Sequence, residues 1–281
     1  MRARNRLLAD MGYGTIGNNQ YQAAPDYIPD NNPTGHNTLI IPEAEVPNEP
    51  STNSSQIDGE SGTIALQQVD GFDVILLDGS AVYGRDDLEL GWLESFQRRL
   101  LTLSDGHFLV IDSFEVRSDR PDSAVQEYWH SNLLEVAPDL GDCRLHLQHV
   151  ESQVLGPSEL LLLPSCHTLL HGVAESAGLI VAGSLEPGTF VIDPPVTFVN
   201  RLGNTELRAK ARFVPDFPVR RDLRIFALLS ATSQSALPTA NISEEVCSTG
   251  ICFDVTIGSQ TWELSFSDAA GGYALTAISP P

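Results

Sequence analysis

The feature that most constrains the fold is a long series of short apolar runs, rich in β-branched and aromatic residues and separated by turn residues. Examples are GTIALQQV, FDVILLD, GHFLVIDSFEV, GLIVAGSL, GTFVIDPPVTFV, LRIFALLS, CFDVTIG and TWELSFS, with turn signals such as LDG, SDG, EPG and IGSQ between runs. Many short strands without intervening helices indicate an antiparallel sandwich or barrel. The sequence therefore predicts an all-β fold, an antiparallel β-sandwich.

One segment leaves the choice between helix and strand open. Residues 88–103, LELGWLESFQRRLLTL, are the best helical candidate and also fit two strands that meet near Glu94. No period of 20 to 50 residues recurs, which argues against a propeller or solenoid. Residues 42–62 are acidic and poor in apolar residues, which predicts a mobile surface insertion between two strands. We therefore expect residues 1–281 to form a single β-sandwich domain with this insertion.

The charge of the chain limits its partners. The 281 residues include 37 acidic and 16 basic ones, for a formal net charge of −21. Such a field repels nucleic acid and anionic membrane surfaces, so we expect neither as a partner. No run approaches the ~20 apolar residues of a transmembrane helix, and the start, MRARNRLLADMGYG, has too short an apolar run for a signal peptide. An acidic ligand would need a metal or local arginines, for which the candidates are Arg98, Arg99, Arg220, Arg221 and Arg224.

The four cysteines leave several pairings open. The segment CSTGIC, from Cys247 to Cys252, suits a hairpin disulfide in an oxidising compartment. Cys143 and Cys166 can form a second disulfide or remain buried thiols. They can also join a zinc site, although no C-x2-C spacing is present. The histidines near them in the sequence are His146, His149, His167 and His171.

Reactive side chains gather in a polar loop near the N-terminus. The stretch YQAAPDYIPDNNPTGHNTL holds Tyr21, Tyr27 and His36 among Pro, Asp, Asn and Gly, which form turns. A polar loop of this kind is either a solvated connection or the rim of an active site. On the residues alone, His36 as a hydrogen-bonded loop histidine and Tyr27 as an aromatic packed on the sandwich rim remain open.

Three pieces of the sequence carry a family resemblance. LLADMGYG (7–14), DYIPDN (26–31) and GHNTLII (35–41) resemble, in this order, part of the C-terminal β-sandwich of heparinase II/III-type polysaccharide lyases. The YIPDN piece is most similar to the oligoalginate-lyase branch. The similarity continues through an Asp-containing strand that ends in Ala-x-Tyr, an Arg-bearing strand, a strand with a central Ile-Asp and a His-containing strand, up to about residue 135. The resemblance implies an antiparallel β-sandwich of the supersandwich type.

The resemblance also implies roles for individual residues. Asp10 and His36 match two ligands of a zinc ion or similar divalent cation, and such ligands suit zinc. The alternative is that Asp10 only caps a turn. Tyr27 matches the catalytic tyrosine, with Tyr21 as the fallback. These enzymes cleave uronic-acid polymers by β-elimination, in which a base removes the C5 proton and an acid protonates the departing glycosidic oxygen. A tyrosine can serve in either role, because nearby cations favour the phenolate.

Parts of the family pattern have no counterpart in this sequence. The resemblance implies a His-x-His-x-Asp strand, with the third metal ligand, and an N-terminal α/α-toroid, whereas only residues 1–9 precede Asp10. We therefore expect the trailing portion of a lyase for alginate-type or glycosaminoglycan-type polysaccharides, inactive alone. Its expected partners are an acidic polysaccharide or oligosaccharide and a missing toroid half.

Other origins and roles remain open. The chain can be a gene fragment, a subunit of a split enzyme or a decayed module. A non-catalytic carbohydrate-binding or assembly β-sandwich is the alternative function, and an unrelated acidic β-sandwich is the third. The parent enzyme is expected in the periplasm or outside the cell.

Overall fold

The computed structural model describes eleven stretches of the chain: residues 37–44, 62–84, 91–103, 107–131, 135–138, 144–148, 177–199, 205–231, 236–247, 250–269 and 271–281. In these stretches the structure is antiparallel sheet, and the helical element η3 is a single 3₁₀ turn, Pro42–Ala44. The predicted all-β fold is confirmed. Most of the predicted insertion, residues 45–61, lies outside the described residues, and the single-domain extent of 1–281 stays a prediction.

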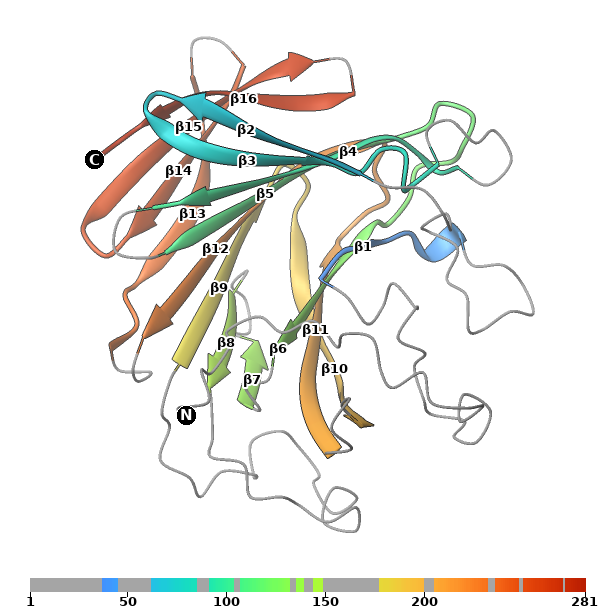
Figure 1. Cartoon of the computed structure of the whole chain (residues 1–281), viewed down its shortest axis with the longest axis vertical. Helices are drawn as coiled ribbons and strands as arrows, with labels where there is room; N and C mark the ends of the chain where they lie inside the picture. Colours follow the sequence, from blue (N-terminus) through green and yellow to red (C-terminus); the bar gives the residue numbers. More distant parts are fainter. Residues whose placement is uncertain are drawn as a thin grey trace.

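Three antiparallel sheets are stacked in layers (Figure 1). The central sheet has eight strands in the order β2-β3-β4-β5-β12-β9-β8-β7. One outer sheet has the order β1-β6-β11-β10, and the other has the order β13-β14-β15-β16. The strands are β1 (Leu39–Ile40), β2 (Thr63–Val69), β3 (Phe72–Asp78), β4 (Leu93–Thr102), β5 (Phe108–Val116), β6 (Gln126–Ser131), β7 (Glu135–Pro138), β8 (Arg144–Gln148), β9 (Ala177–Ser184), β10 (Gly188–Val199), β11 (Thr205–Pro215), β12 (Arg221–Ala231), β13 (Ala240–Glu245), β14 (Ile251–Ile257), β15 (Gln260–Ala269) and β16 (Gly272–Ser279).

The central strands are buried on both faces. In β12, Leu223 and Ile225 belong to the core shared with β14 and β15, whereas Phe226 and Leu228 belong to the core shared with β6, β10 and β11. Successive side chains of a strand point to opposite faces, so each face takes every second residue. A strand covered on both sides therefore reads as a continuous apolar run, as in the sequence IFALL, and not as an alternating one.

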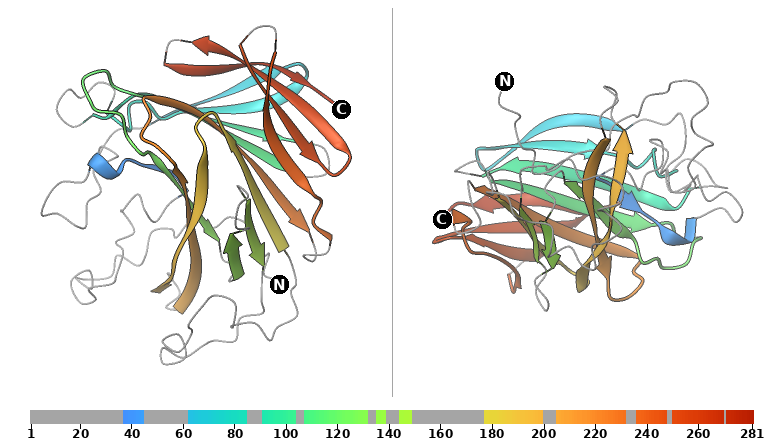
Figure 2. Two further views of the ribbon diagram at one scale, coloured as in Figure 1. Left: turned by 180° about the vertical axis from the view of Figure 1, so that it is seen from behind. Right: turned by 90° about the horizontal axis from the view of Figure 1, so that it is seen from below.

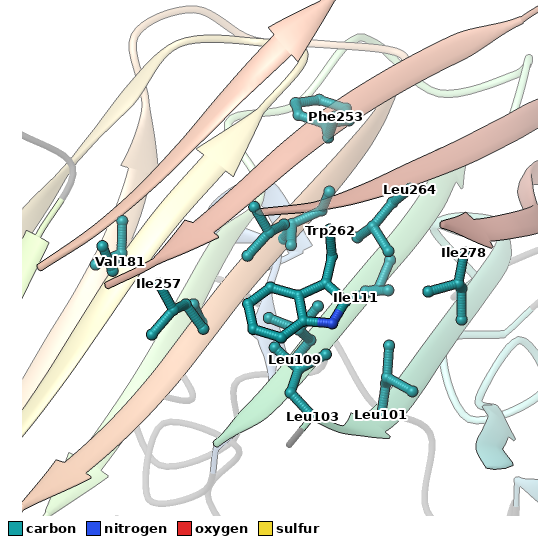
Figure 3. Packing of buried hydrophobic residues seen from close by; sticks show 14 of the residues in the cluster. Leu101, Leu103, Leu109, Ile111, Val181, Phe253, Ile257, Trp262, Leu264 and Ile278 are labelled. Carbon is teal, nitrogen blue, oxygen red and sulfur yellow. The ribbon is translucent and has the colours of Figure 1, made fainter. Parts of the chain in front are cut away.

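The larger core lies between the central sheet and the sheet β13–β16. Trp262 on β15 is its largest side chain and is 2% exposed. Figure 3 shows its indole beside Leu109 and Ile111 of β5, with Ile257 and Ile278 of the outer sheet nearby. This contact attaches the last four strands to the central sheet.

The segment with the open choice between helix and strand forms one strand. β4 runs from Leu93 to Thr102, and its pairing with β5 is irregular between Leu93 and Ser95. The helix is therefore wrong for residues 91–103, and the irregularity in the pairing falls at Glu94, whereas residues 88–90 lie outside the described residues. Because β4 is covered on both faces, apolar residues stand at adjacent positions such as Leu100 and Leu101, and this removes the strand period from the sequence.

Turn chemistry and a disulfide close two hairpins. Asp70 and Gly71 connect β2 to β3 with φ values of +49° and +86°, the two positive values that a type I′ turn requires. Cys247 and Cys252 form a disulfide at the connection between β13 and β14, as the segment CSTGIC predicted. Cys143 and Cys166 lie outside the described residues. In the part of the chain that the structure describes, no helix is long and apolar enough to cross a bilayer.

Candidate functional site

The four residues predicted for the site are outside the structure's described part. Asp10, Tyr21, Tyr27 and His36 all precede residue 37, where the description begins. Their roles stay predictions. Asn37 follows His36 directly in the sequence. The described part that lies nearest to the predicted site is therefore the segment from Asn37 to Leu39, together with the side chains that contact it.

Side chains from two distant segments hold this stretch of backbone. Arg98 Nη1 donates a hydrogen bond to the Asn37 carbonyl oxygen at 2.6 Å. The Tyr83 hydroxyl donates to the Leu39 carbonyl oxygen at 2.9 Å and lies 2.7 Å from Thr38 Oγ1. A phenol has one proton, so Thr38 is the donor in the second contact. The segment that resembles the family's His-Asn-Thr motif is thus anchored through its backbone by Arg98 and Tyr83.

Arg98 belongs to a buried row of charges that crosses the central sheet. The strand register sets Arg98 beside Asp112 and Asp112 beside Arg224. Arg98 donates to both oxygens of Asp112, with Nε–Oδ1 2.8 Å and Nη2–Oδ2 2.6 Å. Its Nη2 also lies 2.8 Å from Oε1 of Glu127 on β6, in the facing outer sheet. One guanidinium therefore joins two layers of the sandwich and the backbone of the predicted site.

The second arginine of the row is held differently. Arg224 is fully buried, and its Nε donates to Asp222 Oδ2 at 2.9 Å. Its guanidinium carbon lies 4.9 Å from the centre of the Phe114 ring and 5.4 Å from that of Phe213. Within the described stretches, Nη1 and Nη2 of Arg224 have no hydrogen-bond partner. The two ring faces therefore supply the electrostatic contact for that end of the side chain.

These contacts bear on the arginines that the sequence offers as candidates for binding an acidic ligand. Arg98, Arg99 and Arg224 have little or no exposed surface, and Arg98 and Arg224 are paired with carboxylates of the chain itself. For these three residues the prediction is wrong. Arg220 and Arg221 are more exposed, and each already pairs with an aspartate, Asp122 and Asp268 respectively.

Glu127 is a fully buried acidic residue of the cluster, and its pKa is shifted. Burial raises the pKa of Glu127 well above its ordinary value, the neighbouring Asp112 carboxylate adds to the rise, and Arg98 opposes it. A neutral Glu127 also balances the charges of the cluster. The two arginines, Arg98 and Arg224, then face two carboxylates, Asp112 and Asp222.

Stability should therefore depend on pH through Glu127. Because the folded pKa is raised, the stabilisation is complete below the ordinary pKa and is lost as pH rises through the folded value. We expect urea unfolding between about pH 5 and 8 to show a free energy of unfolding that falls with pH, and Glu127→Gln to remove this component. The exposed Glu263→Gln is the matched control. Parallel profiles for the parent chain and Glu127→Gln would contradict a neutral Glu127.

Comparison with known proteins connects this fold to solved structures. No protein-family model and no curated protein sequence match the chain. A heparinase III gene product matches over 93% of this chain and 34% of its own, with a TM-score of 0.61 and 11% identity. A mutant of the heparan sulfate lyase HepC from Pedobacter heparinus matches over 82% of this chain and 30% of its own, with a TM-score of 0.52 and 14% identity. The chain has a heparinase III-like fold.

The heparinase-like resemblance read from the sequence is confirmed at the level of fold. The chain spans about a third of the length of the solved structures that it matches. The buried charge cluster was not predicted from the sequence, although Arg98, Asp112 and Glu127 all lie in segments that the resemblance covers. A signal was present, because charged residues inside strongly apolar strands are rarely buried unless they are paired.

Proposed function

We propose that the chain is the β-sandwich portion of a polysaccharide lyase that cleaves uronic-acid-containing polysaccharides by β-elimination. One observation carries the proposal: a heparinase III-like fold covers 93% of this chain. The motif order from LLADMGYG to GHNTLII supports it independently, because those pieces were read from the sequence alone. The buried anchor at Arg98 is consistent with a segment after His36 that must hold one position.

Glycosaminoglycan-type and alginate-type polymers are the two proposed substrate classes. The matched structures are a heparinase III and a heparan sulfate lyase, which supports the first class. The similarity of YIPDN to the oligoalginate-lyase branch supports the second. Both polymers carry a carboxylate next to the C5 proton that elimination removes. A periplasmic or secreted location of the parent enzyme is proposed with them, and the Cys247–Cys252 disulfide supports an oxidising compartment.

In the proposed mechanism, the phenol oxygen of Tyr27 either accepts the C5 proton of the substrate or donates a proton to the departing glycosidic oxygen. Elimination builds up charge on the substrate carboxylate, so a group that neutralises it contributes several kcal/mol. Asp10 and His36 are proposed ligands of a zinc-like cation, which would supply positive charge when bound. In the part of the chain that the structure describes, no group of three His, Cys, Asp or Glu residues is placed to hold a metal. The remaining positioning groups are proposed to come from a toroid half.

Complementation tests the proposal. We expect the chain alone to release no unsaturated uronate from alginate oligomers, heparan sulfate or hyaluronan. Adding the toroid half of a heparinase III-like lyase, fused or as a separate chain, should produce turnover that is followed by ultraviolet absorbance. Because positioning within a cleft supplies much of the rate, the two halves are needed together.

Each other outcome points to a different conclusion. Robust turnover by the chain alone would mean that the active site is misplaced. Saccharide binding without turnover in the complemented enzyme would favour a non-catalytic carbohydrate-binding module. Neither binding nor turnover on any of the three polymers would contradict the proposed function.

A further inference from the structure

The layer between the central sheet and the sheet β1-β6-β11-β10 contains charged side chains as well as an apolar core. Phe226 of β12 and Trp129 of β6 pack against each other in this layer, with their ring centroids 4.9 Å apart. Arg224 precedes Phe226 by two residues, so its side chain points to the same face of β12. Glu127 likewise precedes Trp129 by two residues and shares its face of β6. Figure 2 shows the two sheets from behind and from below.

Three side chains of this layer have buried polar atoms that find no hydrogen-bond partner among the described residues. The atoms are Nη1 and Nη2 of Arg224, Oε2 of Glu127 and Nε1 of Trp129. Arg224 and Glu127 have no exposed surface, and Trp129 is 3% exposed, so bulk solvent does not satisfy these atoms. Folded proteins give nearly all buried polar groups a partner, either from the protein or from ordered water.

Arg224 and Glu127 lie near each other across the layer. Phe213 of β11 lies directly opposite Glu127 in the outer sheet, and the guanidinium carbon of Arg224 is 5.4 Å from the centre of the Phe213 ring. Burial and Asp112 raise the pKa of Glu127, and the charges of Arg98 and Arg224 lower it. In the part of the chain that the structure describes, no ion pair joins Arg224 to Glu127. The two groups are therefore close enough to interact and too far apart for direct contact.

Two other polar links between layers are direct. On the opposite side of the central sheet, the N–H of Ile278 on β16 donates to the Asp70 carboxylate, in the turn between β2 and β3, at 2.8 Å. At the other oxygen of Glu127, Arg98 Nη2 lies 2.8 Å from Oε1. Oε2 of Glu127 has no such contact with Arg224, so this link between the layers needs a mediator.

The chemistry of the unpartnered atoms selects the class of ligand. Nη1 and Nη2 of Arg224 are donors and need an acceptor, whereas Oε2 of Glu127 accepts or, when it carries the proton, donates. A cation would be repelled by Arg224. An anion would add a negative charge to a cluster in which Asp112 and Asp222 already balance the two arginines. Water carries no charge, both donates and accepts, and fits either state of Glu127.

We propose that the layer holds an ordered water molecule that accepts a hydrogen bond from an Nη atom of Arg224 and bonds to Oε2 of Glu127. Buried waters of this kind satisfy polar groups that have no other partner, and they are a fixed part of the structure. A bridge through water is nearly as favourable in enthalpy as a direct hydrogen bond. Glu127 of the outer sheet is thus held by one arginine of the central sheet directly and by the other through water.

High-resolution crystallography of the full chain tests the proposal directly. We expect a solvent peak within hydrogen-bonding distance of both an Nη atom of Arg224 and Oε2 of Glu127. Crystals grown in bromide distinguish water from an anion, because bromide scatters anomalously, and we expect no anomalous peak in this layer. A bromide peak at this position, a direct ion pair between Arg224 and Glu127, or the absence of a peak between them would each overturn the proposal.

Oxygen-17 magnetic relaxation dispersion of the full chain in solution counts the water molecules that stay bound for longer than the protein takes to rotate. Arg224→Met and Glu127→Met each remove one partner of the bridge, so each should have one long-lived water fewer than the parent chain. Arg212→Met is the matched control and should keep the count, because Arg212 precedes Phe213 on β11, points away from the layer and has a side chain that is 30% exposed. Circular dichroism verifies that each variant is folded. An unchanged count in a folded Arg224→Met or Glu127→Met variant would overturn the proposal, and the crystal structure of the parent chain decides the question if neither variant folds.

Discussion

Replacing Arg98 by methionine should lower the free energy of unfolding by about 3–5 kcal/mol, because it leaves two buried carboxyl groups without their cation. Asp112 would lose a bidentate partner, and Glu127 would lose the charge that opposes the rise of its pKa. The hydrogen bond from Arg98 to the Asn37 carbonyl oxygen would be lost as well. Equilibrium unfolding in urea measures the loss.

Two further variants separate this effect from general damage. Arg221→Met breaks an ion pair with Asp268, whose side chain is 74% exposed, and should cost at most about 1 kcal/mol. Replacing Arg98, Asp112 and Glu127 together by apolar residues of similar volume should recover most of the stability, because buried ion clusters cost desolvation energy. A loss for Arg98→Met no larger than that for Arg221→Met would show that the cluster is not a buried electrostatic unit.

Tyr27→Phe should reduce turnover of the complemented enzyme by about 10²–10⁴-fold, the usual contribution of one acid–base group. The substitution keeps the ring and removes only the phenol oxygen that would carry the proton. We expect the loss in kcat with little change in the midpoint of thermal unfolding. Uronate release by the complemented variant, at saturating oligosaccharide, is the measurement.

Tyr21→Phe is the control for this substitution, since Tyr21 is the fallback residue in the same loop. It should leave turnover within a few-fold of the parent enzyme. If Tyr21→Phe abolished turnover and Tyr27→Phe did not, the catalytic assignment would move to Tyr21. If neither substitution reduced turnover, the tyrosine mechanism would be refuted for this chain.

The strands and hairpins could be predicted because their causes are local. Asp70-Gly71 supplies the two positive φ values of a tight turn, and CSTGIC brings Cys247 and Cys252 together within one hairpin. The β4 segment was ambiguous because burial on both faces removes the alternation that distinguishes a strand from a helix. The heparinase-like fold was predicted from the order of several short motifs, and no single residue was enough to indicate it.

The arginine prediction failed for a geometric reason. Arg98 and Arg99 look like one basic cluster in the sequence, but adjacent residues of a strand point to opposite faces of the sheet. Arg98 meets Asp112 through the register of β4 and β5, and it meets Glu127 because β6 belongs to the sheet stacked above. Neither relation is visible without the pairing of the strands and the order of the layers.

The hydrogen bond from Ile278 to Asp70 has a consequence for how quickly the chain can fold. Its two ends are 208 residues apart in the sequence. The pairing of β5 with β12 in the middle of the central sheet also joins distant segments, so it cannot form until β12 is available. Contacts between distant parts of a chain slow folding, because the entropy of closing long loops is lost before the contacts stabilise them. During synthesis on the ribosome, the β2–β3 hairpin would therefore be complete long before the strand that its turn binds.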